Sequence, residues 1–227
     1  MRVRRPPCIM APMPITKLIL IRHGETAWNA ERRLQGHIDI GLNQQGMRQA
    51  RALGQALAET ELDAIISSDL QRAAQTAAAI ASGRGMQVQQ DPALRERCYG
   101  RFEGLLYADI AAAYPGEFAA WQARDVDAVM PPGERPAESF RQFYTRVVAG
   151  LRHWAGTHPG ATIAIVAHGG VLECAYRAAL GLALDTPRDF PVLNASVNRF
   201  TVDDGVIALQ SWGEVAHLAP EALDELP

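Results

Sequence analysis

Short apolar runs alternate along the chain with longer amphipathic stretches. An uninterrupted run of Leu, Ile and Val is typical of a strand that is covered on both faces. Apolar residues three or four positions apart indicate a helix. The apolar runs predict four buried strands, at residues 17–21, 64–66, 86–89 and 162–167. The amphipathic stretches predict helices at residues 43–58, 70–81 and 138–156, and a further one after Gly169 that ends near Leu180. Two alternating segments, 195–202 and 205–211, predict a hairpin around Asp203-Asp204-Gly205.

The order of these elements predicts the fold class. Strands that alternate with helices are typical of an α/β protein with a mostly parallel central sheet and helices on both faces. In such sheets, ligands bind outside the carboxyl ends of the strands. Residues 16–227 are expected to form a single domain, after a basic and proline-containing flexible leader at residues 1–15.

Residues 105–137 interrupt the alternation and are predicted to hold one or two short helices and a loop. Their aromatic residues Tyr107, Tyr114 and Trp121 are spaced by seven, which places them on one face of a helix. Two interpretations stay open. The segment is a small helical insertion that acts as a lid over the ligand site, or its rings only pack it onto the core.

Composition narrows the range of partners. The 227 residues are 48% hydrophobic and 21% charged, as in an ordinary soluble globular protein. The net charge of -3 and the lack of a Lys or Arg run argue against nucleic acid. No stretch has the roughly 18 apolar residues of a membrane helix, and no apolar signal-peptide core is present. Three widely spaced cysteines, Cys8, Cys98 and Cys174, suit a reducing, cytoplasmic location.

Two of the predicted strands end in a histidine followed by glycine. Arg22-His23-Gly24 follows the first strand, and His168-Gly169-Gly170 follows the strand at 162–167. A ring at this position sits on the rigid edge of the sheet, and the glycine lets backbone approach a ligand. The neighbouring Arg22 has a planar fork that matches phosphate oxygens.

Two more charged groups follow predicted strands. Arg72 lies in the first turn of the helix at 70–81, and Glu96 lies in a loop between Arg95 and Arg97. Each of these residues alone has a simpler explanation. Arg72 is then a surface residue of its helix, Glu96 belongs to a solvated charge cluster, and each histidine is a core residue that ends a strand. Together they supply two imidazoles, two guanidiniums and a carboxylate, which is the set of groups that phosphoryl transfer requires.

The segment Leu20-Ile21-Arg22-His23-Gly24-Glu25-Thr26-Ala27-Trp28-Asn29 closely resembles the signature of the histidine phosphatase superfamily, also called the phosphoglycerate-mutase-like family. The resemblance continues through Gln35-Gly36, SSDLQRAAQTA, LRERCYGRFEG and VAHGG, in the family's order, and covers roughly residues 17–217. It implies a phosphoglycerate-mutase-like fold and a metal-independent phosphatase or mutase activity; a phosphatase of this family would need no cofactor.

The resemblance also implies roles for individual residues. His23 would be the nucleophile that forms a phosphohistidine, and Glu96 the general acid that then becomes the base. Arg22, Arg72 and His168 would hold the phosphate oxygens. Further contacts to phosphate or substrate are expected from a group of neighbouring residues, namely Asn29, Gln35, Gly36 and Gly169.

Within the family, the sequence favours the phosphatase branch. Between Leu105 and Ala137 the only basic residues are Arg124 and Arg135, beside five acidic ones. A doubly phosphorylated mutase ligand would find few partners there. The expected substrate is a small phosphorylated metabolite, and a homodimer stays open.

Three alternatives also stay open. They are a cofactor-dependent phosphoglycerate mutase, a non-catalytic protein that binds phosphorylated ligands, and a metal-dependent hydrolase that uses His23, His37 and His168. The last lacks carboxylates at a suitable spacing. The family's usual Gly-Gly-Glu-Ser is replaced by Pro136-Ala137-Glu138-Ser139. The resemblance therefore implies no substrate contacts for this part of the chain.

Overall fold

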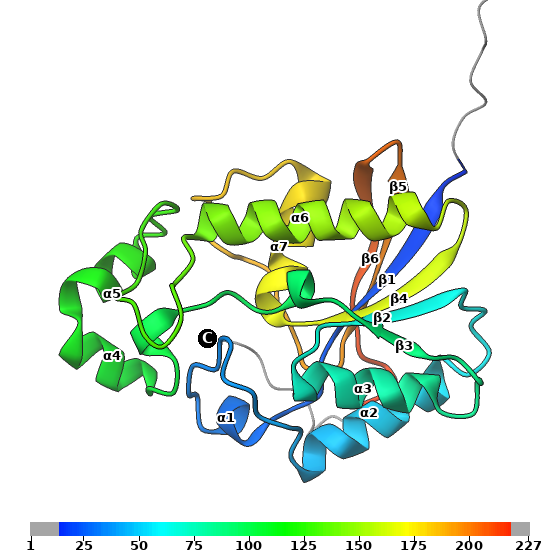
Figure 1. Ribbon diagram of the computed structural model, residues 1–227, viewed down its shortest axis with the longest axis horizontal. Coiled ribbons are helices and arrows are strands. Elements are labelled where there is room, and N and C mark those ends of the chain that lie inside the picture. The colour runs from blue at the N-terminus through cyan, green and yellow to red at the C-terminus, as the bar shows by residue number, and fades with distance from the viewer. Residues whose placement is uncertain (1–13, 219–227) are drawn as a thin grey trace, which may run out of the picture.

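A computed structural model describes residues 14–218, so the predicted leader lies almost wholly outside the described residues. A six-stranded sheet forms its centre, in the order β3-β2-β4-β1-β5-β6 (Figure 1). The strands are β1 (Thr16–Arg22), β2 (Ala64–Ser67), β3 (Val88–Gln90), β4 (Thr162–Ala167), β5 (Val197–Asp203) and β6 (Val206–Glu214). Strands β1 to β4 are parallel to one another, and β5 runs antiparallel to both of its neighbours, β1 and β6. The prediction of a mostly parallel sheet is confirmed.

Helices cover both faces of this sheet. The α-helices of the described residues are α1 (Ala27–Ala30), α2 (Gln44–Ala56), α3 (Gln71–Ala81), α4 (Tyr107–Ala113), α5 (Pro115–Gln122), α6 (Phe140–Thr157) and α7 (Gly169–Leu180). The helices α2 and α3 lie on one face, and α6 and α7 lie on the other (Figure 1). Single 3₁₀ turns at Pro92–Leu94 and Gly100–Phe102 lie on either side of Glu96, in the loop predicted for it.

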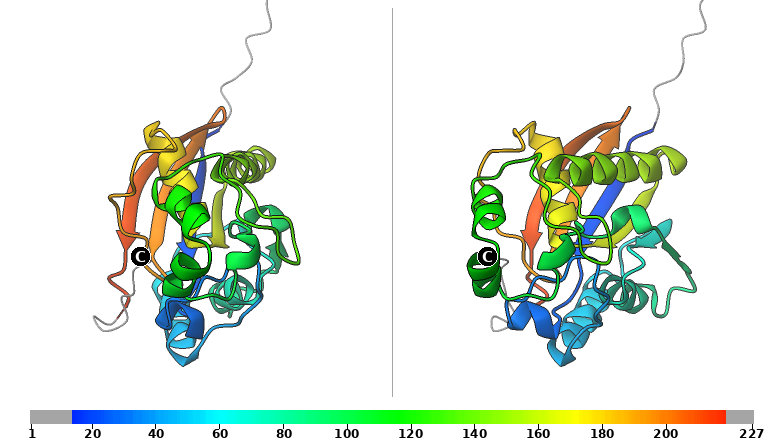
Figure 2. Two further views of the ribbon diagram at one scale, coloured as in Figure 1. Left: turned by 90° about the vertical axis from the view of Figure 1, so that its left-hand side faces the viewer. Right: turned by 60° about the vertical axis from the view of Figure 1, so that its left-hand side comes forward.

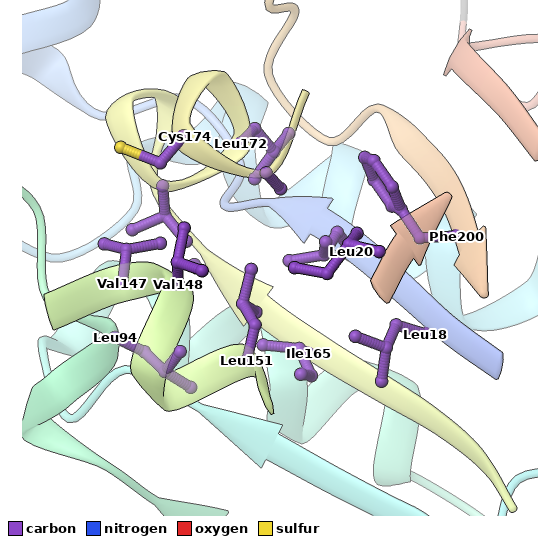
Figure 3. Close-up of a cluster of buried hydrophobic side chains, with 14 of the residues drawn as sticks. Leu18, Leu20, Leu94, Val147, Val148, Leu151, Ile165, Leu172, Cys174 and Phe200 are labelled. Carbon is purple, nitrogen blue, oxygen red and sulfur yellow. The ribbon is translucent and has the colours of Figure 1, made fainter. Parts of the chain in front are cut away.

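The centre of strand β1, Leu18 to Ile21, is apolar at every position. Leu18 and Leu20 point towards α6 and α7 and join a cluster with Leu151 and Leu172 (Figure 3). The intervening Ile19 and Ile21 join a second cluster with α2 and α3. Because successive side chains of a strand point to opposite faces, a strand between two helical layers needs apolar residues at every position.

Helix boundaries follow the capping residues. The side chain of Asn43 accepts a hydrogen bond from the Gly46 amide at 2.8 Å and caps α2, as its position predicted. The long helix α6 begins at Phe140, two residues later than predicted, because Ser139 forms a capping box with Gln142. The four-residue helix α1 was not predicted, since one turn is too short to show a period.

The insertion at 105–137 forms the two short helices α4 and α5, which lie beside the body of the molecule (Figure 2). Tyr107 stacks on Trp121, with ring centroids 5.6 Å apart, and both line the central cavity described below. Tyr114 instead packs on Phe102 at 5.3 Å. Tyr107 and Trp121 therefore form part of the cavity wall, while Tyr114 packs the insertion onto Phe102. The prediction that the rings share one helix face is wrong, because α4 ends before Tyr114 and α5 begins at Pro115. The lid stays a prediction.

Candidate active site

The histidines of the two His-Gly pairs meet at one edge of the sheet. Strands β1 and β4 are parallel neighbours, and Arg22 pairs with Ala167 in their register. The next residues, His23 and His168, therefore lie side by side, with ring centroids 5.2 Å apart. Both rings are buried, as is the side chain of Arg22.

Arg72 is buried in the same edge and is not a surface residue. It follows β2, which ends next to β4, and it is the second residue of α3. Its Nε donates to Nδ1 of His168 at 3.3 Å. The two terminal nitrogens donate to the carbonyl oxygens of Ile38 at 3.0 Å and Gly36 at 2.8 Å. All three nitrogens of the guanidinium thus donate hydrogen bonds, which fixes the orientation of its plane.

The hydrogen bonds also fix the tautomers of the two histidines. Nδ1 of His23 lies 2.7 Å from the Gly24 carbonyl, so it carries the proton and leaves a lone pair on Nε2. Burial, and then the positive charges of Arg72 and Arg22, keep the pKa of His23 well below its usual value. The ring is therefore a neutral imidazole at neutral pH, which is the state that a nucleophile requires.

His168 is neutral for the same physical reasons. Burial and the charge of Arg72 keep its pKa well below the usual value. Since Nδ1 accepts from Arg72, the ring proton is on Nε2, which donates to the Ser68 hydroxyl at 2.8 Å. Ser68 takes up this Nε2–H, so the donors that line the cavity and face an anion are the guanidiniums of Arg22 and Arg72.

Glu96 faces the same cavity, although both of its neighbours are arginines. Arg95 pairs with Asp69, and Arg97 donates to the carbonyl oxygens of Glu138 and Ala128, so both point away. The Glu96 carboxylate instead accepts hydrogen bonds from two backbone amides. Oε1 accepts from Arg97 at 2.8 Å, and Oε2 accepts from Gly170 at 2.9 Å.

The remaining predicted contacts surround this group. Asn29, Gln35, Gly36 and Gly169 all line the cavity. The Thr26 hydroxyl lies 3.0 Å from both Asn29 Oδ1 and Gln35 Oε1, which orients the two amides. The structure therefore brings every site residue predicted from the sequence to one place.

The cavity measures about 510 Å³, within the usual range for small-molecule sites. Several of its lining residues were not singled out in the sequence, among them Arg32, Arg33, Arg188, Glu173, Trp28 and Tyr99. Burial, and then the charge of Glu96, raise the pKa of the Tyr107 hydroxyl to about 12, so this wall carries no negative charge at neutral pH. Arginines outnumber acidic residues around the cavity, which suits an anionic ligand.

His37 does not join the other histidines. Its Nε2 donates to the Glu96 carbonyl at 2.7 Å, from the loop before α2. Within residues 14–218, no three side chains of His, Cys, Asp or Glu lie together as a metal site would require.

No helix in this part of the chain is long and apolar enough to cross a membrane.

Phosphoryl transfer depends on positioning and on charge stabilisation. A neutral imidazole among fixed guanidinium donors at the carboxyl edge of a parallel sheet offers both, and this fold and site define a phosphoryl-transfer enzyme. The chain belongs to the histidine phosphatase superfamily (branch 1), whose family model matches residues 18–215.

Individual relatives agree with this assignment. The chain is 38% identical to phosphoglycerate mutase-like protein 4 of Arabidopsis thaliana, over 89% of this chain and 86% of that protein. It is 37% identical to the metal-independent phosphoserine phosphatase of the same plant, over 90% of this chain and 84% of that protein. Among solved structures, Bacillus stearothermophilus YhfR superposes with a TM-score of 0.81 at 35% identity, covering 89% of this chain and 98% of that one.

Proposed function

We propose that this protein is a metal-independent phosphatase that hydrolyses a phosphomonoester through a phosphohistidine on His23. The observation that carries the proposal is the buried, neutral ring of His23. Its Nδ1 is tied to the Gly24 carbonyl, and its pocket is lined by Arg22 and Arg72. Among the described residues that line the pocket, His23 alone has a side-chain nitrogen with a lone pair that can attack phosphorus.

The proposed reaction has two steps. Nε2 of His23 attacks phosphorus, the bond from phosphorus to the ester oxygen breaks, and the leaving alkoxide takes a proton from Glu96. Glu96 then removes a proton from water, the resulting hydroxide attacks the phosphohistidine, and inorganic phosphate leaves. Arg22 and Arg72 stabilise the charge on the transferred oxygens throughout, and His168 joins them when its Nε2–H turns from Ser68 to a phosphate oxygen.

Charge in the insertion supports a phosphatase over a mutase. Of its two basic residues, Arg124 lines the cavity but is ion-paired with Glu173. Arg135 donates to the carbonyl oxygen of His37 and does not line the cavity. Neither is well placed to bind a second phosphate group.

A mutase is the second candidate, because of one specific observation. Arg32, Arg33 and Arg188 come from outside the insertion and line the same cavity. They add positive charge that the insertion itself does not provide. A carboxylate or a second phosphate on the substrate would be attracted to them.

Phosphate release from an aryl phosphate, in the presence of a chelator, tests the proposal. Wild-type protein is expected to turn over, and His23→Ala is expected to be inactive because no other group forms the covalent intermediate. Turnover by His23→Ala, or loss of wild-type turnover in chelator, would refute the mechanism. Incubation with 3-phosphoglycerate, with and without 2,3-bisphosphoglycerate, separates the two candidates: a mutase isomerises it, and a phosphatase releases phosphate.

A further inference from the structure

Gly170 makes an unusually close approach to Glu96. It is the second residue of α7, and its amide donates the hydrogen bond to Glu96 Oε2. A Cβ atom built on Gly170 would meet Glu96 Oε1 at 2.2 Å and Cδ at 3.1 Å. It would also meet Cε1 of Phe143 at 2.9 Å. The carboxylate thus occupies the space that any side chain at position 170 would need.

Backbone conformation does not explain this glycine. Gly170 is helical and is not among the glycines with positive φ. Alanine is the better helix former, so helix formation alone would favour it here. Gly150, buried in α6, shows the contrast, because a Cβ there would make only ordinary contacts of 3.6 Å and more. Position 170 therefore requires glycine because Glu96 and Phe143 fill the space of a side chain.

We propose that Gly170 is a positioning residue for Glu96. Its amide holds Oε2, the Arg97 amide holds Oε1, and its missing side chain lets the carboxylate lie against the start of α7. A general acid acts only within hydrogen-bond reach of the leaving oxygen, so a displaced carboxylate is a poor one. The inference rests on the acid role that the proposed function gives to Glu96.

Kinetics on two substrates test the inference. For an alkyl phosphate, whose leaving group needs a proton, Gly170→Ala is expected to lower kcat/KM roughly 10²-fold. For p-nitrophenyl phosphate, whose leaving group departs without one, the expected loss is under about tenfold. A change that only loosened the fold would lower both values equally. Gly150→Ala is the matched control and is expected to leave both unchanged.

Rescue separates the carboxylate from the ring of Phe143. Aspartate is one methylene shorter and withdraws its oxygens from a new methyl group at 170. Adding Glu96→Asp to Gly170→Ala is therefore expected to recover roughly tenfold of the alkyl-phosphate activity, although the same change alone lowers it. Rescue by Phe143→Leu instead, or equal losses on both substrates, would overturn the inference in favour of simple packing.

The acid role itself is tested in parallel by Glu96→Gln in otherwise wild-type protein. If it lowers kcat/KM equally for the two substrates, the proposed acid role of Glu96 fails. If it lowers kcat/KM selectively for the alkyl phosphate while Gly170→Ala has no effect, only the positioning inference fails. Thermal unfolding of each variant shows whether it is folded under the assay conditions.

Discussion

Nε of Arg72 donates a hydrogen bond to Nδ1 of His168 over 3.3 Å, and both side chains are fully buried. The bond leaves the His168 proton on Nε2, where Ser68 accepts it. Residues that follow two neighbouring strand ends, those of β2 and β4, are thereby locked together beside the ring of His23, which follows β1. The orientation of the guanidinium, and not only its charge, is therefore part of the site.

Arg72→Lys keeps the charge and removes the fork. A lysine ammonium cannot reach His168, Ile38 and Gly36 together, so the phosphoryl oxygens lose an aligned donor. We expect kcat/KM for an aryl phosphate to fall roughly 10²-fold or more, as when other anion-stabilising donors are removed. The exposed Arg48, changed to Lys, is the control. Wild-type kinetics in Arg72→Lys would place the guanidinium outside the reaction.

Glu96→Gln is expected to trap the covalent intermediate. Glutamine cannot take a proton from water, so the phosphohistidine forms from an activated aryl phosphate but hydrolyses slowly. Rapid mixing should show a burst of the phenol, about one equivalent per site, followed by slow phosphate release. Intact-mass measurement should show one added phosphoryl group.

His23→Ala is the control for the trapping experiment, since it removes the acceptor nitrogen. It is expected to show neither the burst nor the added mass. A phosphorylated species in His23→Ala, or the absence of one in an active Glu96→Gln, would contradict the assignment of nucleophile and base.

The sheet and the centre of the site could be predicted because both depend on short-range signals. Strand β4 was predicted residue for residue, and the His-Gly pairs mark the ends of β1 and β4. The contributions of Arg188 and Glu173 were not predictable, because nothing local indicates that they face the cavity. The direction of Glu96 was equally hidden, since it depends on Arg95 finding Asp69.

Acid should destabilise this protein through its buried histidines. The folded-state pKa of His23 and of His168 lies well below the unfolded value of about 6.5. Below that pH the unfolded chain binds protons that the folded chain does not bind. The free energy of unfolding therefore decreases as the pH is lowered. Urea denaturation should therefore show lower stability at pH 5.5 than at pH 7.5.

His168→Asn should reduce that slope between pH 7.5 and 5.5, because one of the two contributing groups is gone. Asn retains a donor and an acceptor for the buried partners Arg72 and Ser68. His153→Asn, at an exposed position on α6, is the matched control and should leave the slope unchanged. An unchanged slope in His168→Asn would mean that this ring binds protons equally in the folded and unfolded states.

Glu173 forms ion pairs with two arginines of very different burial. Removing the carboxylate should therefore cost much more stability than removing the more exposed arginine. Arg177 is fully buried and donates to Glu173 Oε1 at 2.9 Å, while Arg124, at the end of α5, is partly exposed. Glu173→Ala leaves the Arg177 charge buried without its carboxylate, and should lower the free energy of unfolding by about 3–5 kcal/mol. Arg124→Ala should cost about 1 kcal/mol or less. Urea denaturation of both variants at pH 7.5 measures the two costs; equal values would show that Arg177 does not depend on Glu173.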